Sequence, residues 1–139
     1  MNRQTLLIVL GLGAIVLAAV YLQTASEDET VRAGVALVEV TVPDLSDRAM
    51  SGKAVFDQNC AGCHGSNAAG VDGSGPPLVH VIYEPGHHSD PAFYLAVEQG
   101  VRAHHWPFGD MAPIDGLERA EVASIIDYIR EMQRANGIE

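Results

Sequence analysis

The apolar positions of this chain form one long block at the N-terminus and several shorter helical patterns after it. From Leu6 to Leu22 no residue is charged. As a helix this block would be roughly 25 Å long, at the short end of a membrane span. Arg3 precedes it and an acidic run at 27–29 follows it, which favours export of everything after the block. We therefore expect a membrane anchor over residues 1–24.

A cleaved signal peptide is the alternative interpretation of this N-terminal block. The tripeptide at 24–26, Thr-Ala-Ser, is compatible with a small-x-small cleavage site. The apolar run is longer than the hydrophobic region of most signal peptides, which favours the anchor. Under either interpretation the rest of the chain lies outside the cytoplasm.

Residues 25–45 are predicted to be a tether, and two helices are expected after it. The tether includes an apolar-polar alternation that predicts a short strand or an extended run ending at Pro43. A helix is expected from Ser46 to Gln58, with Ser46 as its cap. Its central Gly52 is costly unless a second helix approaches closely. The next helix covers 89–100, with a proline near its start and a glycine at its end.

The last helix, 118–133, has the clearest pattern. An apolar stripe at helical spacing runs along it, Tyr128 lies beside that stripe, and charged residues including Arg130 lie elsewhere. The stripe consists of Val122, Ile125, Ile126 and Ile129. The exported domain, 46–139, is therefore expected to be all-α, with three or more short helices. Its loops at 65–88 and 101–116 are long for a compact domain, which is typical of loops that enclose a large cofactor.

Charge narrows the choice of partner. Acidic residues outnumber basic ones 18 to 8, a net charge of −10, so nucleic acid is not expected to bind. A basic protein surface is a more natural partner, although the charge also serves solubility.

Both cysteines lie in one short motif, "NCAGCHG", as Cys60 and Cys63 with His64 next to the second. A structural zinc site needs four ligands and the chain has no second cysteine pair. A thioredoxin-type dithiol expects a βαβ context, and a disulfide would leave His64 unexplained. C-x-x-C-H is the attachment motif of c-type haem, with the histidine as an iron ligand. We predict one covalent haem c, attached in bacteria outside the inner membrane.

The second axial ligand of the iron is sought among four methionines. Met1 belongs to the N-terminal block, Met50 lies too close ahead of the motif, and Met132 ends the last helix. Met111, in the loop "FGDMAP", is the candidate, and packing of that loop on the core is the simpler alternative. A histidine in this role, His104 or His105, is the other possibility.

Residues 46–133 resemble a class I c-type cytochrome. "GKAVFDQNCAGCH" is similar to the opening helix of that family, with Gly52 and Phe56 at matching positions. "GPPL" at 75–78 resembles the family's Gly-Pro-x-Leu, which implies that the Pro76 carbonyl accepts a hydrogen bond from Nδ1–H of His64. Met111 matches the distal methionine of the family.

The resemblance extends to the end of the domain, with departures. "SIIDYI" resembles the terminal helix, which implies that Ile125 and Tyr128 cross the opening helix. Ala112 separates the methionine from the proline that commonly follows it, and the last helix lacks a Ser or Thr cap. Lys53 is the only lysine, so the lysine ring of mitochondrial carriers is absent.

The resemblance implies an electron carrier rather than an enzyme, because both axial positions of the iron are filled. Its donor and acceptor would be redox proteins in or at the membrane, with no small-molecule substrate. One alternative is a haem-bearing subunit of a membrane-bound dehydrogenase, oxidase or reductase complex. Another is an enzyme or sensor in which Met111 leaves the iron. The expected location is the bacterial inner membrane, single-pass, with the haem domain in the periplasm, or the soluble periplasm after cleavage.

The remaining histidines include two adjacent pairs, His87 with His88 and His104 with His105, besides the single His80. The pairs suggest a second metal site, for example for copper. Hydrogen bonds to haem propionates, loop packing or simple solvation are the simpler explanations. Further candidates to meet the propionates are Tyr83, Arg102 and Trp106.

Overall fold

The computed structural model describes residues 2, 14–18 and 34–139, in two compact units, Met1–Ala33 and Gly34–Glu139. Most of the predicted anchor, 1–24, lies outside the described residues. Residues 14–18 are helical, with exposed side chains at Ile15, Val16 and Leu17. None of the helices described here has both the length and the apolar character that crossing a membrane requires.

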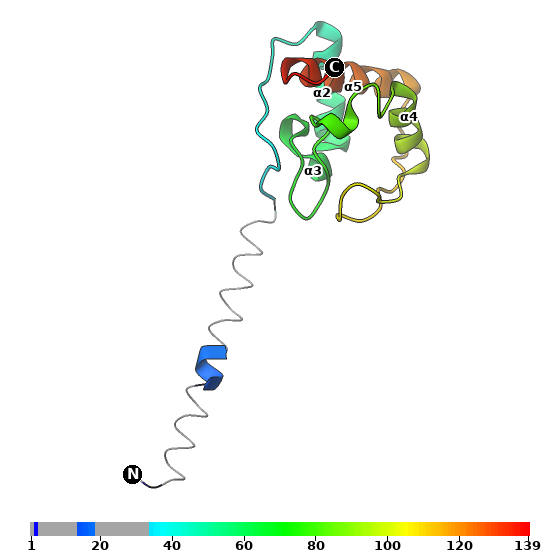
Figure 1. The fold of residues 1–139 in the computed structure, drawn as a ribbon. Helices are drawn as coiled ribbons and strands as arrows, with labels where there is room; N and C mark the ends of the chain where they lie inside the picture. The colour runs from blue at the N-terminus through cyan, green and yellow to red at the C-terminus, as the bar shows by residue number, and fades with distance from the viewer. Residues whose placement is uncertain (1, 3–13, 19–33) are drawn as a thin grey trace. The chain divides into compact units, whose positions relative to one another are not determined.

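The second unit is built from helices and loops (Figure 1). The elements in chain order are α2 (Asp47–Asn59), α3 (Ala61–His64), the 3-10 turns η1 (Ser66–Ala68) and η2 (Val81–Tyr83), α4 (Asp90–Gln99) and α5 (Arg119–Ala135). The three predicted helices are present as α2, α4 and α5, each within two residues of its expected bounds. The three short elements were not predicted, because one turn is too short to show a periodic pattern.

Helices α2 and α5 cross at Gly52 and form the centre of the core (Figure 1). A Cβ atom at Gly52 would overlap the Ser124 carbonyl and lie 2.8 Å from the Ile125 nitrogen, so only glycine allows this approach. One turn on, the rings of Phe56 and Tyr128 pack with centroids 5.4 Å apart. The predicted crossing of opening and terminal helices is confirmed.

The last helix begins without a Ser or Thr cap, and glutamates take that role. The Glu118 side chain accepts from the backbone N–H of Glu121, and the Glu121 carboxylate accepts from the N–H of Glu118 at 2.8 Å. This reciprocal pair satisfies two N–H groups that the helix itself leaves free. The boundary that the sequence left open is thus set by a capping box.

Ser46 caps α2 as predicted and also connects it to α5. Its Oγ accepts from Ala49 N–H at 3.2 Å and donates to Glu131 Oε1 at 2.6 Å, while its N–H donates to Glu131 Oε2 at 3.0 Å. These two bonds to the Ser46 side chain and backbone lower the pKa of Glu131. A lowered carboxyl pKa stabilises the fold above the ordinary glutamate range, and this contribution is lost as pH falls through the lowered value.

We expect Ser46→Ala to reduce the free energy of unfolding of the haem domain by about 1 kcal/mol at neutral pH, through loss of the cap. The variant should also lose less stability than the parent between neutral pH and about pH 4, because Glu131 keeps fewer partners. Denaturant unfolding of both proteins at the two pH values measures this. Equal stability at neutral pH would contradict the assignment of Ser46 as the cap.

Residues 34–45 lie along the second unit as an extended run, and no strand is present in 34–139. Leu37 and Val38 donate from their N–H groups to the Ala69 carbonyl at 3.1 and 3.2 Å. The Asn136 side chain bonds both the N–H and the carbonyl of Thr41, each at 2.8 Å. The compact unit therefore begins at Gly34, within the segment that the sequence assigned to the tether.

Arg130 corrects one expectation from the sequence, because it is buried, at 7% exposed. Its guanidinium donates to Asp90 Oδ1 at 2.9 Å, to the Tyr83 carbonyl at 2.7 Å and to the His88 carbonyl at 2.6 Å. Gln133 is also buried and donates to the carbonyls of residues 78 and 83. These bonds fix the loop between η2 and α4 against α5.

Candidate haem site

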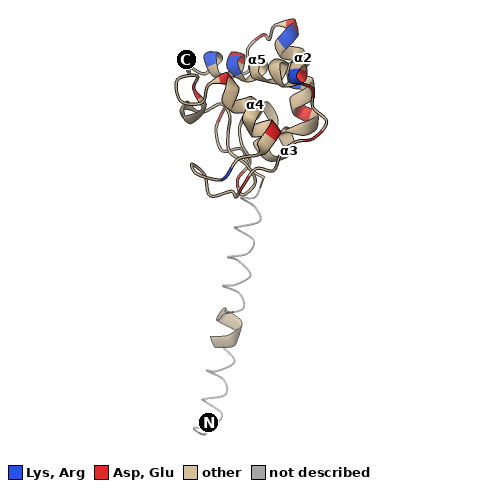
Figure 2. Cartoon of the chain, turned by 90° about the vertical axis from the view of Figure 1, so that its right-hand side faces the viewer, with Lys and Arg blue, Asp and Glu red and all other residues tan. Residues whose placement is uncertain are grey.

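An apolar cavity of about 320 Å³ lies between α4, α5 and the two long loops. None of the residues that line it carries an Asp, Glu, Lys or Arg side chain. Figure 2 shows the basic residues mostly on α2 and α5, and in 34–139 only Arg102 is basic outside these two helices. A group bound in the cavity would therefore be surrounded by low-dielectric walls. The lining includes Phe56, Cys60, His64, Pro76, Leu78, Tyr83, Phe93, Leu95, Trp106, Met111, Ile125 and Ile129.

The two thiols of the C-x-x-C-H motif lie at the start of α3 and within it. They are not joined by a disulfide, and Cys60 lines the cavity while Cys63 is exposed. Burial, with a smaller effect of Cys63, raises the pKa of Cys60 to about 11. Dithiol oxidoreductases need the opposite shift, toward a reactive thiolate. The environment thus argues against a redox dithiol and is compatible with a site of covalent attachment.

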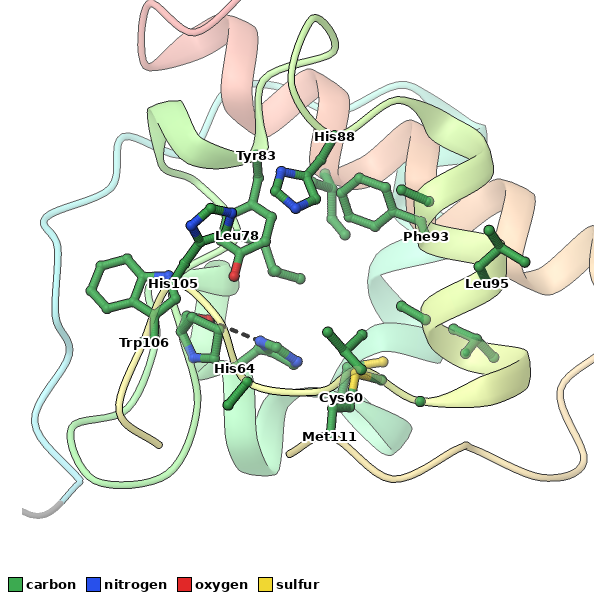
Figure 3. Close-up of a pocket in the computed structure, with 18 of the residues that line it drawn as sticks. Cys60, His64, Leu78, Tyr83, His88, Phe93, Leu95, His105, Trp106 and Met111 are labelled. Atoms are coloured by element: carbon green, nitrogen blue, oxygen red, sulfur yellow. Dashed lines mark hydrogen bonds between the residues drawn. The ribbon is translucent and has the colours of Figure 1, made fainter. Parts of the chain in front are cut away.

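His64, at the end of α3, is oriented by the loop that follows η1. Its Nδ1–H donates to the Pro76 carbonyl at 2.9 Å, the bond that the sequence resemblance implied. Because a carbonyl only accepts, the proton is on Nδ1 and the lone pair is on Nε2. Burial lowers the pKa of His64 more than this bond raises it. Figure 3 shows the edge of the ring that does not face Pro76 turned into the cavity. His64 is thus a neutral imidazole whose Nε2 lone pair is free to bind a metal.

Met111 lines the same cavity from the other long loop. Its backbone forms an antiparallel bridge with Val101, with N–H to carbonyl distances of 2.9 Å in both directions. Gly100, at a φ of +74°, allows the loop to pass closely over the Met111 carbonyl. Met50 is 52% exposed and Met132 is in the core. Of the methionines that the structure describes, Met111 alone lines the cavity.

Trp106 supplies a polar atom without a partner at the cavity. Its Nε1 is buried and has no hydrogen-bond partner among the residues that the structure describes. Burial raises the pKa of Tyr83, which also lines the cavity. A buried N–H needs an acceptor, which a bound group with carboxylates would provide. Arg102 is exposed and does not line the cavity, so the structure does not bring this third candidate into the site.

The features of the cavity agree with haem c as its occupant. The two thiols can attach this group covalently, a neutral imidazole and a thioether are ligands that its iron uses, and the apolar walls suit a porphyrin. A zinc site at the motif is not supported, because within the described residues the one cluster of potential metal ligands is His87, His88 and His105. When bound, haem c supplies a one-electron Fe(III)/Fe(II) couple.

Comparison with known proteins agrees with this chemistry. The sequence profile described as Cytochrome c matches residues 49–133, more than half of the chain. The cytochrome bc1 complex cytochrome c subunits of Mycobacterium bovis and Mycobacterium tuberculosis are each 36% identical over 78 residues, which cover 51% of this chain. The match spans a quarter, 25%, of the length of these relatives. No solved structure matches significantly. The chain belongs to the cytochrome c family, and its cofactor is a covalently bound haem c.

Proposed function

We propose that this protein carries single electrons between membrane partners through one haem c with His64 and Met111 as axial ligands. The observation that supports this most directly is the apolar cavity, without Asp, Glu, Lys or Arg side chains, that both His64 and Met111 line. A carrier needs both axial positions filled, so that the iron changes its charge without binding a substrate.

In this carrier, the residues of the site attach the haem, bind its iron and set its reduction potential. Cys60 and Cys63 anchor the group covalently, and the Pro76 carbonyl holds the His64 tautomer that binds iron and increases its basicity. The Met111 thioether favours Fe(II), which raises the reduction potential relative to a second histidine. The apolar walls of the cavity also raise the reduction potential, because a low dielectric disfavours the more highly charged oxidised state of the haem.

We further propose that residues 1–24 anchor the protein in the bacterial inner membrane, with the haem domain in the periplasm. The uncharged block from Leu6 to Leu22 and the acidic run after it support this orientation. An anchor would confine diffusion to the membrane plane and raise the effective concentration of partners there. A net charge of −10 favours docking on basic surfaces of these partners.

Carbon monoxide tests whether the iron has an open position. The reduced holoprotein should bind carbon monoxide slowly and incompletely, because Met111 must first leave the iron. The measurement is the visible spectrum of the reduced protein with and without the gas. Rapid and complete binding would overturn the carrier function and favour a sensor or an enzyme.

A second candidate function is that of a haem-bearing subunit within a membrane complex. Similarity to relatives described as cytochrome c subunits of a cytochrome bc1 complex favours it. Affinity purification of the full chain from membranes in mild detergent separates the two functions. A catalytic partner in fixed stoichiometry would support the subunit, and a protein that elutes alone would support the free carrier.

A further inference from the structure

Histidines from two separate loops meet at the rim of the cavity. His87 and His88 precede α4, and His104 and His105 lie in the loop that leads to Met111. The ring centroids of His87 and His105 are 5.3 Å apart, and those of His88 and His105 are 5.4 Å apart. Figure 3 shows the His88 and His105 rings on the same side of the cavity. Nothing in the haem chemistry described above requires this cluster.

Three of these side chains have the spacing of metal ligands. One ring nitrogen from each of His87, His88 and His105 lies within 4.8 Å of the other two. The Nε2 atoms of His87 and His105 are 3.4 Å apart. Two nitrogens at about 2.0–2.1 Å from one tetrahedral ion are about 3.4 Å apart. His87 and His105 are therefore already at the separation that a bound ion imposes.

The hydrogen bonds that hold His88 resemble those of metal-binding histidines. Its Nδ1–H donates to the Ile82 carbonyl at 2.6 Å, which leaves the Nε2 lone pair free. Metal-bound histidines usually donate their second ring N–H to such an acceptor. The backbone of His88 is held by Arg130 at its carbonyl and by the Glu84 carbonyl at its N–H. This ligand position is thus fixed by α5.

We propose that His87, His88 and His105 bind one divalent late first-row ion, Zn²⁺ or Cu²⁺, at a site separate from the haem iron. Three neutral imidazoles without a carboxylate suit these ions rather than Mg²⁺ or Ca²⁺.

The site lies at the rim of the haem pocket. His87 is exposed and does not line the cavity, whereas His88 and His105 line it and His105 is also exposed. A bound ion would join the loop before α4 to the loop that carries Met111. It would thereby restrain the two loops that close the cavity.

Titration of the full-length oxidised holoprotein, freed of loosely bound metal by a chelator, tests the proposal. Calorimetry with Zn²⁺ should give one ion per chain, and Cu²⁺ should show nitrogen couplings from three imidazoles in its electron paramagnetic resonance spectrum. Mg²⁺ should not bind. His87→Ala and His105→Ala should each weaken affinity more than the roughly 10–100-fold typical of losing an outer-shell partner. His80→Asn removes a histidine outside the triad and is the matched control, with unchanged affinity.

Three results would overturn the proposal. The first is that neither Zn²⁺ nor Cu²⁺ binds, and the second is that His87→Ala and His105→Ala both bind the ion as the parent does. The third is that His80→Asn weakens binding as much as these two variants do. The haem spectrum of His87→Ala provides an independent readout and should match that of the parent. If this variant changed the axial ligation of the iron, the histidines would belong to the haem site and the separate metal site would be wrong.

Discussion

Gly52→Ala should destabilise the haem domain by about 3 kcal/mol or more, at the upper end for overpacked cores. The new methyl group would overlap the Ser124 carbonyl and lie 2.8 Å from the Ile125 nitrogen. Both are backbone atoms of α5, so no side chain can rotate away, and the two helices must separate. Phe56 on α2 and Ile125 on α5 also line the cavity, so this separation would open the haem site itself.

Denaturant unfolding of the holoprotein, with its haem content, measures this effect. Gly86→Ala is the matched control, because a Cβ there meets only the end of the Glu84 side chain at 3.8 Å and the backbone is not left-handed. We expect the control to fold and to carry haem as the parent does. If the two variants were equally stable, the close crossing at Gly52 would not be needed for the fold.

Replacing Met111 by alanine should change the redox properties of the haem without unfolding the domain. The oxidised protein should lose the weak sulfur–iron charge-transfer band. The reduction potential should fall by more than about 0.1 V, within the roughly 0.8 V range that axial ligands control. The reason is that the thioether stabilises Fe(II), whereas water or a histidine in its place does not. Visible spectroscopy and a potentiometric titration measure both changes.

The control for this experiment is Met50→Ala, which removes an exposed methionine outside the cavity. Its spectrum and potential should equal those of the parent. A charge-transfer band that persists in Met111→Ala would show that a different sulfur binds the iron. A band that is absent from the parent would show that no sulfur binds it, and His104 and His105, which also line the cavity, would then become the candidates for the distal position.

Features that depend on short sequence spans could be predicted. The C-x-x-C-H motif, the cap at Ser46 and the proline and glycine at the ends of α4 are encoded within a few residues each. The crossing at Gly52 was predictable because a glycine inside a helix destabilises it, and a close approach of a second helix accounts for its presence. The bond from His64 to Pro76 followed from the family resemblance and not from spacing alone.

Contacts between distant segments that leave no local signal in the sequence could not be predicted. Arg130 was expected to lie away from the apolar stripe, although it follows Ile126 by four residues and so lies near that stripe. Its charge is buried because carbonyls of residues 83 and 88 are brought to it by a loop without periodic pattern. The contact between His87 and His105 likewise depends on the loop between η2 and α4 and on the loop before Met111.

The central claim is that one haem is bound axially by His64 and Met111. Nuclear magnetic resonance of the reduced full-length protein, with ¹³C in its methionine methyl groups, tests it most directly. A methyl group held against the haem face is shifted far upfield by the ring current of the porphyrin. We predict one such signal, and its disappearance in Met111→Ala while the others remain. No strongly shifted methyl signal, or one that survives this substitution, would contradict the ligand assignment and the carrier function built on it.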